Sequence, residues 1–445
     1  MRLLVIGAGD VGSSIAASLS GSHEIVVVDI DRDRVDSLTY EYDVLPIHGD
    51  GTSLETLEEA NASEADIVIA STDSDETNLA ISGTIKTISD AFTIARVQNP
   101  SYLETWQRSH TAFDVDFMVC SDLLTAQAVV RLIGLPTARD VDPFAGAIVQ
   151  MAEFEVPSGS PLTNRTIADA DRFEDLTFAA IVREGTAIIP GGSDVIEAGD
   201  RVVVIGRPTS VRQFATAVTA QETLEETEDV VIVGGSSIGY QIARLLEERG
   251  IAPRLFESDP ERARSLAERL PETTVMEHDA TDHEFLEREH VSDADVVVSA
   301  LDSDEKTLLA SLVAKRVGVE RTIAVVERGE YVDIFETVGV DVAVNPRELT
   351  AEEITRFTRD RRAENVAILE SGTAEVIEVE VDDESVLVDR TISDGVTDLP
   401  DGVVIGAITR DGEYVVPRGD TVVEENDHVV LFVREAVVDD VLDLL

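Results

Sequence analysis

Short apolar runs alternate with amphipathic stretches along the first quarter of the chain. The run Arg2–Ile6 and the run Val26–Asp29 are β-branched and bounded by polar residues, which is typical of buried strands. Between them, Gly12–Leu19 carries apolar residues at helical spacing. This alternation predicts a parallel sheet with right-handed crossovers and helices on both faces.

The same plan occurs a second time, more than two hundred residues later. The matched segments keep their order and spacing: LLVIGAGDVG with VVIVGGSSIG, VVVD with RLFE, HGDGT with EHDAT, ADIVIASTDSDET with ADVVVSALDSDEK, and TIARV with TIAVV. Internal repetition of this extent predicts two copies of one domain, over residues 1–122 and 228–347.

The segments that follow each copy also repeat, in a different style. NRTIAD matches DRTISD and FAAIVREG matches IGAITRDG, with short alternating strands and Gly or Asp turns between them. We therefore expect a small β-rich α+β domain over residues 138–220 and another over 364–445. The acidic stretch Gln221–Asp229 is either a linker or a solvated helix end. The fold class is α/β, with two Rossmann-like doubly wound sheets, each followed by a β-rich domain.

Composition narrows the class of protein. A chain of 445 residues with 43% hydrophobic residues can bury several cores. It has no apolar run of membrane-spanning length and no signal-peptide pattern, so we expect it in the cytoplasm. The single cysteine, Cys120, excludes a disulfide framework and a cysteine-built zinc site, and its apolar neighbours favour a core position.

The net charge of −54 is spread along the whole chain, and lysine occurs only at Lys86, Lys306 and Lys315. A uniform acidic coat of this kind resembles the surface of proteins from a halophilic, high-salt cytoplasm, where salt screens self-repulsion. It also argues against binding to nucleic acid or to an anionic membrane.

The first glycine loop has the context that nucleotide binding requires. Gly7, Gly9 and Gly12 form GxGxxG directly between a strand and a helix. Gly7 makes the turn, Gly9 lets the backbone reach a pyrophosphate, and Gly12 allows close packing of helix on sheet. Asp29, at the end of the second strand, can accept both ribose hydroxyls and repels a 2′-phosphate, so NAD(H) is favoured over NADP(H).

Other candidates follow the later strands. Asp50 falls near the adenine edge, and Thr72 and Asp73 close the fourth strand at the carboxyl edge of the sheet. Arg96 ends the fifth strand and is either a donor to the pyrophosphate or a surface ion-pair partner. For Asp75 and Asn78 we expect helix capping.

The second glycine loop departs from the first at three positions. Ser236 stands where the second glycine belongs and crowds the closest approach of a pyrophosphate. Glu257 replaces the ribose aspartate and remains compatible with hydroxyl recognition. Val325 replaces Arg96 and removes a cation. Nucleotide binding in this copy stays open.

The sequence carries no established catalytic motif. The seven histidines have no metal-ligand spacing such as HExxH, and neither a GxSxG nor a GxxxxGK[ST] pattern occurs. The β-rich domains are too small to be the usual substrate domain of a dehydrogenase. We therefore expect no enzymatic activity.

The chain resembles the TrkA family, the peripheral NAD-binding subunits of Trk potassium uptake that are built of RCK (KTN) N and C domains. The resemblance covers nearly the whole chain and rests most on DSDETN at 73–78, AKRVG at 314–318 and the repeat order. It implies a ring-like homo-oligomer that regulates an integral-membrane potassium transporter subunit from the cytoplasmic side, with NAD(H) as ligand and ATP or ADP left open.

The resemblance also implies which residues contact the nucleotide. In the first copy these are Gly7, Ala8, Gly9, Asp10, Val11, Asp29, Thr72, Asp73 and Arg96; in the second they are Gly234, Gly235, Ser236, Ser237, Ile238 and Glu257. Two alternatives remain: an NAD-dependent oxidoreductase, and a regulatory subunit of another ion channel or of a K⁺/H⁺ antiporter.

Overall fold

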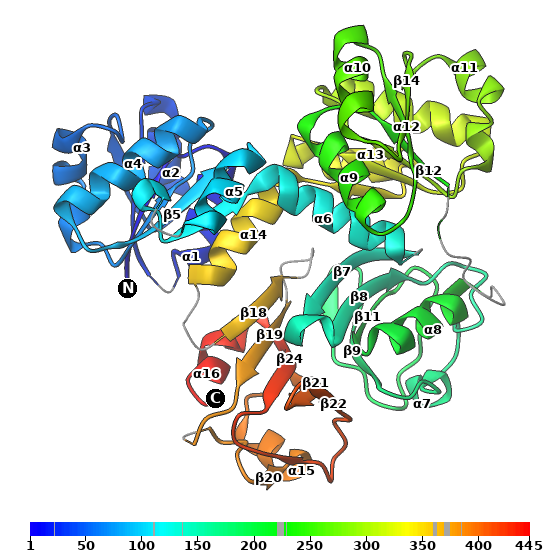
Figure 1. Cartoon of the computed structure of the whole chain (residues 1–445). Coiled ribbons are helices and arrows are strands. Elements are labelled where there is room, and N and C mark those ends of the chain that lie inside the picture. Colours follow the sequence, from blue (N-terminus) through cyan, green and yellow to red (C-terminus); the bar gives the residue numbers. More distant parts are fainter. Residues whose placement is uncertain are drawn as a thin grey trace. The chain divides into compact units, whose positions relative to one another are not determined.

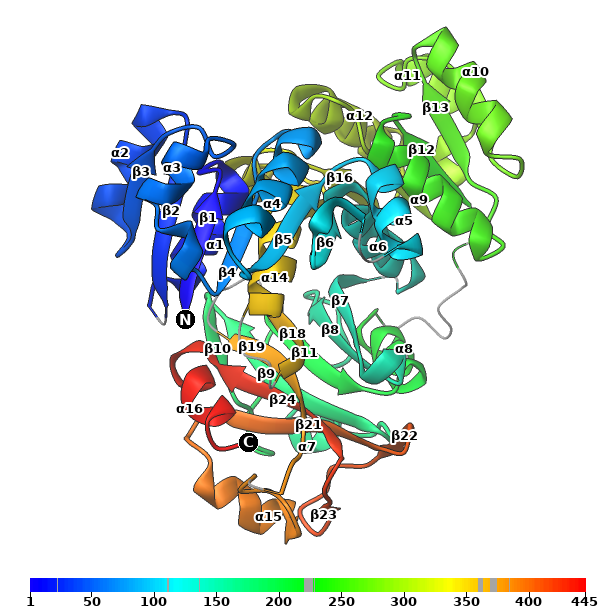
Figure 2. The same cartoon turned by 60° about the vertical axis from the view of Figure 1, so that its left-hand side comes forward.

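The computed structural model describes residues 1–21, 23–109, 112–135, 137–219, 227, 229–358, 363–368, 374–383 and 385–445 (Figures 1 and 2). Most of the expected linker at 221–229 therefore lies outside the described residues. Contacts divide the chain into two compact units. Unit 1 comprises Met1–Val130 with Thr227–Thr358, and unit 2 comprises Arg131–Glu226 with Arg359–Leu445.

The first lobe of unit 1 is a six-stranded parallel sheet with strand order β3-β2-β1-β4-β5-β6. This is the doubly wound order, which reverses direction between β1 and β4. Its elements are β1 (Arg2–Ile6), α1 (Asp10–Leu19), β2 (Glu24–Asp29), α2 (Arg32–Glu41), β3 (Leu45–His48), α3 (Leu54–Glu59), β4 (Ile67–Ala70), α4 (Asp75–Ile88), β5 (Phe92–Val97), α5 (Pro100–Arg108), β6 (Phe117–Cys120) and α6 (Ser121–Gly134).

The second lobe of unit 1 repeats this topology, with strand order β14-β13-β12-β15-β16-β17. Its elements are β12 (Val230–Val233), α9 (Ser237–Glu248), β13 (Arg254–Glu257), α10 (Pro260–Arg269), β14 (Thr274–Glu277), α11 (His283–Arg288), β15 (Val296–Ser299), α12 (Asp304–Val317), β16 (Thr322–Val325), α13 (Val332–Thr337), β17 (Val342–Val344) and α14 (Pro346–Thr358).

Helix α14 belongs to the second lobe by sequence but packs on the first. Ala351 and Ile354 are buried in one cluster with residues of β1 and α1, such as Leu3 and Ile15. Phe357 stacks on Phe117, with ring centroids 4.1 Å apart. Figure 1 shows α14, in yellow, beside α1 of the first lobe. The two lobes are therefore joined by an exchanged helix, which buries apolar surface on both sides of the junction.

The same side-chain hydrogen bonds occur at the start of α4 and of α12, and they show that the capping role expected of Asp75 is wrong. Ser74, not Asp75, caps α4, because its hydroxyl accepts from the Thr77 N–H at 3.2 Å. The Asp75 carboxylate accepts from the N–H groups of Gln98 and Asn99, at 2.8 and 2.9 Å. Asp304 and Ser303 divide the same tasks in the second lobe. The capping expected of Asp75 is wrong: the carboxylate ties α4 to the loop after β5.

The described part of unit 2 holds two five-stranded antiparallel sheets, with strand orders β10-β9-β11-β8-β7 and β18-β19-β24-β21-β22, and a two-stranded antiparallel sheet, β20-β23. The first part comprises β7 (Ala138–Phe144), β8 (Val149–Glu155), α7 (Ile167–Ala170), β9 (Leu176–Arg183), β10 (Thr186–Ile188), β11 (Arg201–Gly206) and α8 (Pro208–Thr219). The second comprises β18 (Ala363–Ile368), β19 (Ala374–Glu380), β20 (Arg390–Thr391), α15 (Ile392–Gly395), β21 (Val403–Arg410), β22 (Glu413–Val415), β23 (Val422–Val423), β24 (His428–Arg434) and α16 (Val438–Leu442).

The two five-stranded sheets of unit 2 share one core. Phe144, Met151 and Ile205 of the first part cluster with Val376 and Phe432 of the second. The predicted class, two doubly wound parallel sheets each followed in sequence by a β-rich part, is confirmed. The two parallel-sheet lobes form one compact unit and the two β-rich parts form the other, so neither parallel sheet shares a unit with the β-rich part that follows it in sequence.

Within the described part of the chain, no helix is both long enough and apolar enough to cross a membrane.

Candidate nucleotide-binding site

The first glycine loop, Gly7–Gly12, is held by two glycines that the backbone requires. Gly7 has φ +107°, and a Cβ there would lie 2.9 Å from the carbonyl carbon of Ser71 and the nitrogen of Thr72. A Cβ on Gly12 would lie 1.8 Å from the Gly7 carbonyl oxygen. These positions fix the turn from β1 into α1 against the end of β4, at the point where the strand order reverses.

Gly9 differs from its two neighbours because the fold itself tolerates a side chain there. Its φ of −71° is ordinary, and a Cβ would meet only Nη1 of Arg34, at 3.3 Å. Gly9 is the N-cap of α1 and provides no side-chain cap hydrogen bond. The first-turn N–H groups of α1 thus lack a side-chain cap, at the positive end of the helix dipole.

The remaining loop residues divide into buried and exposed positions. Ala8 and Val11 are buried and pack in the core beneath the loop. Asp10 is the first residue of α1, and its exposed carboxylate pairs with Arg347 of α14. The sequence predicted Asp10 as a loop contact but gave no sign of this partner, which is 337 residues away.

Asp29 is buried at the end of β2 and clamps the loop. One carboxylate oxygen accepts from the Ala8 N–H at 2.5 Å, and the other accepts from the Asp31 N–H at 2.7 Å. A carboxylate oxygen can accept more than one hydrogen bond, so both oxygens retain capacity for ribose hydroxyls. The carboxylate is therefore already oriented beside the loop.

Three further candidates lie at the carboxyl ends of β4 and β5. Thr72 is held by Asn78, whose amide oxygen accepts from the Thr72 N–H at 2.9 Å. The Asn78 amide also donates to the Arg96 carbonyl at 2.8 Å, so Asn78 bridges two strand ends and is not a helix cap as expected. The Arg96 guanidinium is buried, donates to the Ser121 hydroxyl at 3.0 Å and lies 3.5 Å from the Asp73 carboxylate.

Asp50 makes its own turn. Its carboxylate accepts from the N–H and the hydroxyl of Thr52, at 2.9 and 2.7 Å, and these bonds lower its pKa. Asp279 does the same with Thr281 in the second lobe. Asp50 follows the end of β3 and its carboxylate bonds Thr52. The first glycine loop, Asp29, Thr72, Asp73 and Arg96 follow the ends of the neighbouring strands β1, β2, β4 and β5.

The second glycine loop, Gly234–Gly239, keeps the backbone geometry of the first. Gly234 has φ +104°, and a Cβ on Gly239 would lie 2.1 Å from the Gly234 carbonyl oxygen. Glu257 is buried, and its carboxylate accepts from the N–H groups of Gly235 and Asp259, at 2.9 and 2.7 Å. The longer acid therefore repeats the clamp made by Asp29.

Ser236 supplies what Gly9 lacks. Its hydroxyl accepts from the Gly239 N–H at 3.2 Å and donates to the Ala300 carbonyl at 2.8 Å. The serine therefore caps α9 and occupies one N–H of the helix terminus. It does not close the space beside the loop, where a cavity of about 190 Å³ is lined by Ser236, Glu257 and Lys306 among others. Ser237 and Ile238 begin α9; Ile238 is buried and Ser237 faces the adjoining pocket.

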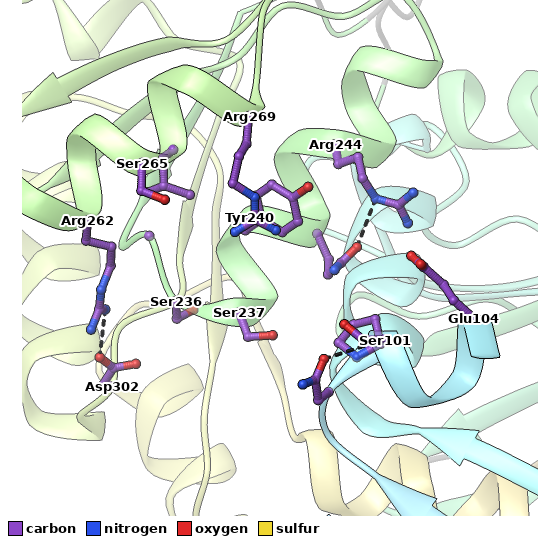
Figure 3. A pocket seen from close by; sticks show the side chains of 15 residues that line it. Ser101, Glu104, Ser236, Ser237, Tyr240, Arg244, Arg262, Ser265, Arg269 and Asp302 are labelled. Atoms are coloured by element: carbon purple, nitrogen blue, oxygen red, sulfur yellow. Dashed lines mark hydrogen bonds and ion pairs between the residues drawn. The ribbon is translucent and has the colours of Figure 1, made fainter. Parts of the chain in front are cut away.

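That adjoining pocket has a volume of about 410 Å³ and an unusual share of arginine for so acidic a protein (Figure 3). Arg262 pairs with Asp302 at 3.0 Å, and the Arg269 guanidinium lies over the Tyr240 ring, 3.9 Å from its centroid. Sequence reasoning missed these arginines. One of them, Arg262, could have been found by comparing the two copies of the repeat. Arg262 lies five residues after Glu257, as Arg34 lies five residues after Asp29.

The fold and the two glycine loops define a class of protein with tandem Rossmann-type lobes and antiparallel β-rich parts. The family model described as the TrkA-N domain matches residues 3–119 and 230–346, and the TrkA-C domain model matches residues 151–218 and 376–445. The chain belongs to the TrkA family.

Relatives in other organisms match over nearly their whole length. The Trk system potassium uptake protein TrkA homolog of Archaeoglobus fulgidus is 37% identical, covering 98% of this chain and 97% of its own. TrkA of Vibrio alginolyticus is 33% identical, covering 97% and 95%. Among solved structures, the GsuK RCK domain matches with a TM-score of 0.62 at 18% identity, covering 99% of this chain and 95% of that one, which shows a shared fold.

Proposed function

We propose that this chain is the cytoplasmic nucleotide-binding regulatory subunit of a Trk-type potassium uptake system. It binds NAD(H) at the first glycine loop and alters the state of an integral-membrane potassium transporter subunit. The observation that carries the proposal is the uncapped terminus of α1 beside the clamped, buried carboxylate of Asp29. Backbone donors suit a pyrophosphate, and the carboxylate suits ribose hydroxyls.

The names of the relatives support the potassium part of the proposal. The proteins of Archaeoglobus fulgidus and Vibrio alginolyticus are both named for Trk potassium uptake, and both match along nearly the whole chain. A GsuK channel structure bound to NAD shares the fold. We extend potassium uptake and NAD binding to this chain. We also propose that it forms a ring-like homo-oligomer and that ADP or ATP competes for the site. Its four domains are proposed to span residues 1–122, 138–220, 228–347 and 364–445.

The carboxylates at and near the glycine loops make structural hydrogen bonds to backbone N–H groups, which agrees with a regulatory role without catalysis. Asp29 and Glu257 orient backbone N–H groups, and Asp75 and Asp304 tie helices to the following loops. A nucleotide can then act by its differential affinity for two conformations of the assembly. The alternative, a dehydrogenase, would use the same loop to present a nicotinamide to a substrate.

Rubidium uptake in cells that lack the chain's gene tests the proposal. The wild-type chain should restore uptake, and Gly9→Asp should not, because a carboxylate at Gly9 blocks and repels a pyrophosphate. Gly83→Asp on α4 is the matched control, since a Cβ there meets nothing within 4 Å.

Each outcome separates the candidates. The proposal predicts restored uptake with Gly83→Asp and lost uptake with Gly9→Asp at equal protein levels. A dehydrogenase predicts full uptake with both variants and a lost NADH-oxidising activity with Gly9→Asp. Full uptake with a folded Gly9→Asp chain would overturn gating through the first loop.

A further inference from the structure

The two lobes of unit 1 reach into each other's glycine loops. Arg347 is the second residue of α14, and its guanidinium pairs with Asp10 at the start of α1 in the first lobe. Asp122 is the second residue of α6, and its carboxylate accepts a hydrogen bond from Ser237 at the start of α9 in the second lobe. Asp10 and Ser237 hold the same position in the two loops.

This exchange places opposite charges at the two loops. The first loop faces a guanidinium contributed by the other half of the chain, and the second faces a carboxylate. From these contacts we propose that Arg347 completes the first nucleotide site from the second lobe, as a cation that donates to the phosphates of a nucleotide bound at Gly7–Gly12. The inference rests on the proposed function and names a further binding residue of that site.

The position of Arg347 is fixed from both lobes. The apolar face of α14 packs on the first lobe through the buried Ala351 and Ile354, and Phe357 stacks on Phe117. Its N-terminus is tied to its own lobe by Asn345, whose amide oxygen accepts from the Arg347 N–H at 2.9 Å and whose amide donates to the Val326 carbonyl at 2.9 Å. The backbone that carries the guanidinium is therefore anchored beside the loop before any ligand arrives.

The Arg347 guanidinium neutralises the Asp10 carboxylate and still has N–H donors available for a phosphate. Asp10 puts a carboxylate, 61% exposed, at the helix terminus that would receive the phosphates. An unpaired carboxylate there would repel an anion, and Arg347 neutralises it. A guanidinium has five N–H donors, and besides Asp10 it meets Glu327, with Nε 3.7 Å from the carboxylate. Donors thus remain for a phosphate, and charge-assisted bonds of this kind are the strong ones.

The second glycine loop has no arginine from the other lobe at the corresponding position. Asp122 of α6 holds the position that Arg347 holds in α14, and its burial raises the pKa of its carboxyl group. A phosphate at the start of α9 would meet this carboxylate as well as the hydroxyl cap of Ser236. The exchanged helices therefore bring a cation to the first loop and a carboxylate to the second, whose cations, Arg262 and Lys306, come from its own lobe.

NADH titration of the full-length chain, followed by nucleotide fluorescence in concentrated KCl, tests the inference. Arg347→Gln should weaken NADH binding by about tenfold or more, since it removes a charged donor. Asp10→Asn should raise the affinity, because it removes a repulsion and frees the guanidinium. The double variant should recover part of the loss. Arg328→Gln, an exposed arginine paired with Glu330 at 2.8 Å, is the matched control and should bind as wild type.

The outcomes separate this inference from the proposed function. If the wild type binds neither NADH nor ADP, the proposed function fails and this inference fails with it. If the wild type binds and Arg347→Gln binds equally well, only the inference fails. If Asp10→Asn weakens binding as much as Arg347→Gln does, Arg347 is only a structural link to Asp10, and the inference is again overturned. If Arg347→Gln fails to fold, Asp10→Asn is judged against the wild type: tighter NADH binding supports the inference, and equal or weaker binding overturns it.

Discussion

Replacing the two loop-clamping acids one at a time separates their structural task from ribose recognition. In Asp29→Ala, the N–H groups of Ala8 and Asp31 lose their acceptor, and in Glu257→Ala those of Gly235 and Asp259 lose theirs. The buried N–H of Ala8 or of Gly235, left unsatisfied, costs about 1–3 kcal/mol, whereas Asp31 and Asp259 are exposed and their N–H groups can turn to water. Each variant should therefore lose about 1–3 kcal/mol of folding free energy. Because the contacts match, the two losses should be similar.

Nucleotide affinity should distinguish the two variants. At the first loop, Asp29→Ala also removes the acceptor of the ribose hydroxyls, and charged hydrogen bonds contribute about 1.5–3 kcal/mol each. A loss of about 2.7 kcal/mol corresponds to about 100-fold in affinity. We therefore expect NADH binding to fall at least about 100-fold in Asp29→Ala and to change little in Glu257→Ala.

Thermal melts and NADH titrations on the same preparations, at one KCl concentration, measure both effects. Glu257→Ala serves as the control for loop damage, because it loses equivalent backbone contacts without touching the first loop. The reasoning is refuted if both variants lose similar amounts of stability and Glu257→Ala loses as much NADH affinity as Asp29→Ala.

Two further predictions concern charge. Burial raises the pKa of Asp122, so its ionised form destabilises the folded state above that pKa, and the penalty fades as pH falls toward 3.8, the ordinary pKa of an aspartate. Asp122→Asn should therefore melt at a higher temperature than wild type at about pH 8, by a margin that shrinks in melts at lower pH; equal melting temperatures at about pH 8 would contradict this. The net charge of −54 predicts that melting temperature falls as salt is lowered from about 1 M to about 0.01 M, where the screening length grows from about 3 Å to about 30 Å; a flat profile would show that the acidic coat has no structural effect.

Local patterns in the sequence predicted the sheets, the loops and the acid beside each loop because each depends on residues close along the chain. Gly7 and Gly12 were assigned to the turn by spacing alone, and the structure gives each a steric reason. The parallel, doubly wound character of both sheets followed from the repeated alternation of strand and helix.

Two kinds of contact could not be predicted from the sequence. In the segment Ser74–Asp75, both residue types are good helix caps, and only the tertiary position of the loop after β5 decides which of them caps α4. The pairing of Arg347 with Asp10 joins residues 337 positions apart through an exchanged helix, which no local pattern encodes. The grouping of like parts into two units depends on shared cores in the same way.

The central claim is that the first glycine loop is a working nucleotide site because Gly9 leaves the terminus of α1 uncapped. Titrating NADH onto the wild-type chain and onto Gly9→Ser, which gives the first loop the residue found at Ser236, tests it most directly. We expect saturable binding to the wild type and at least about tenfold weaker binding to a folded Gly9→Ser chain. Equal binding by both chains would contradict it.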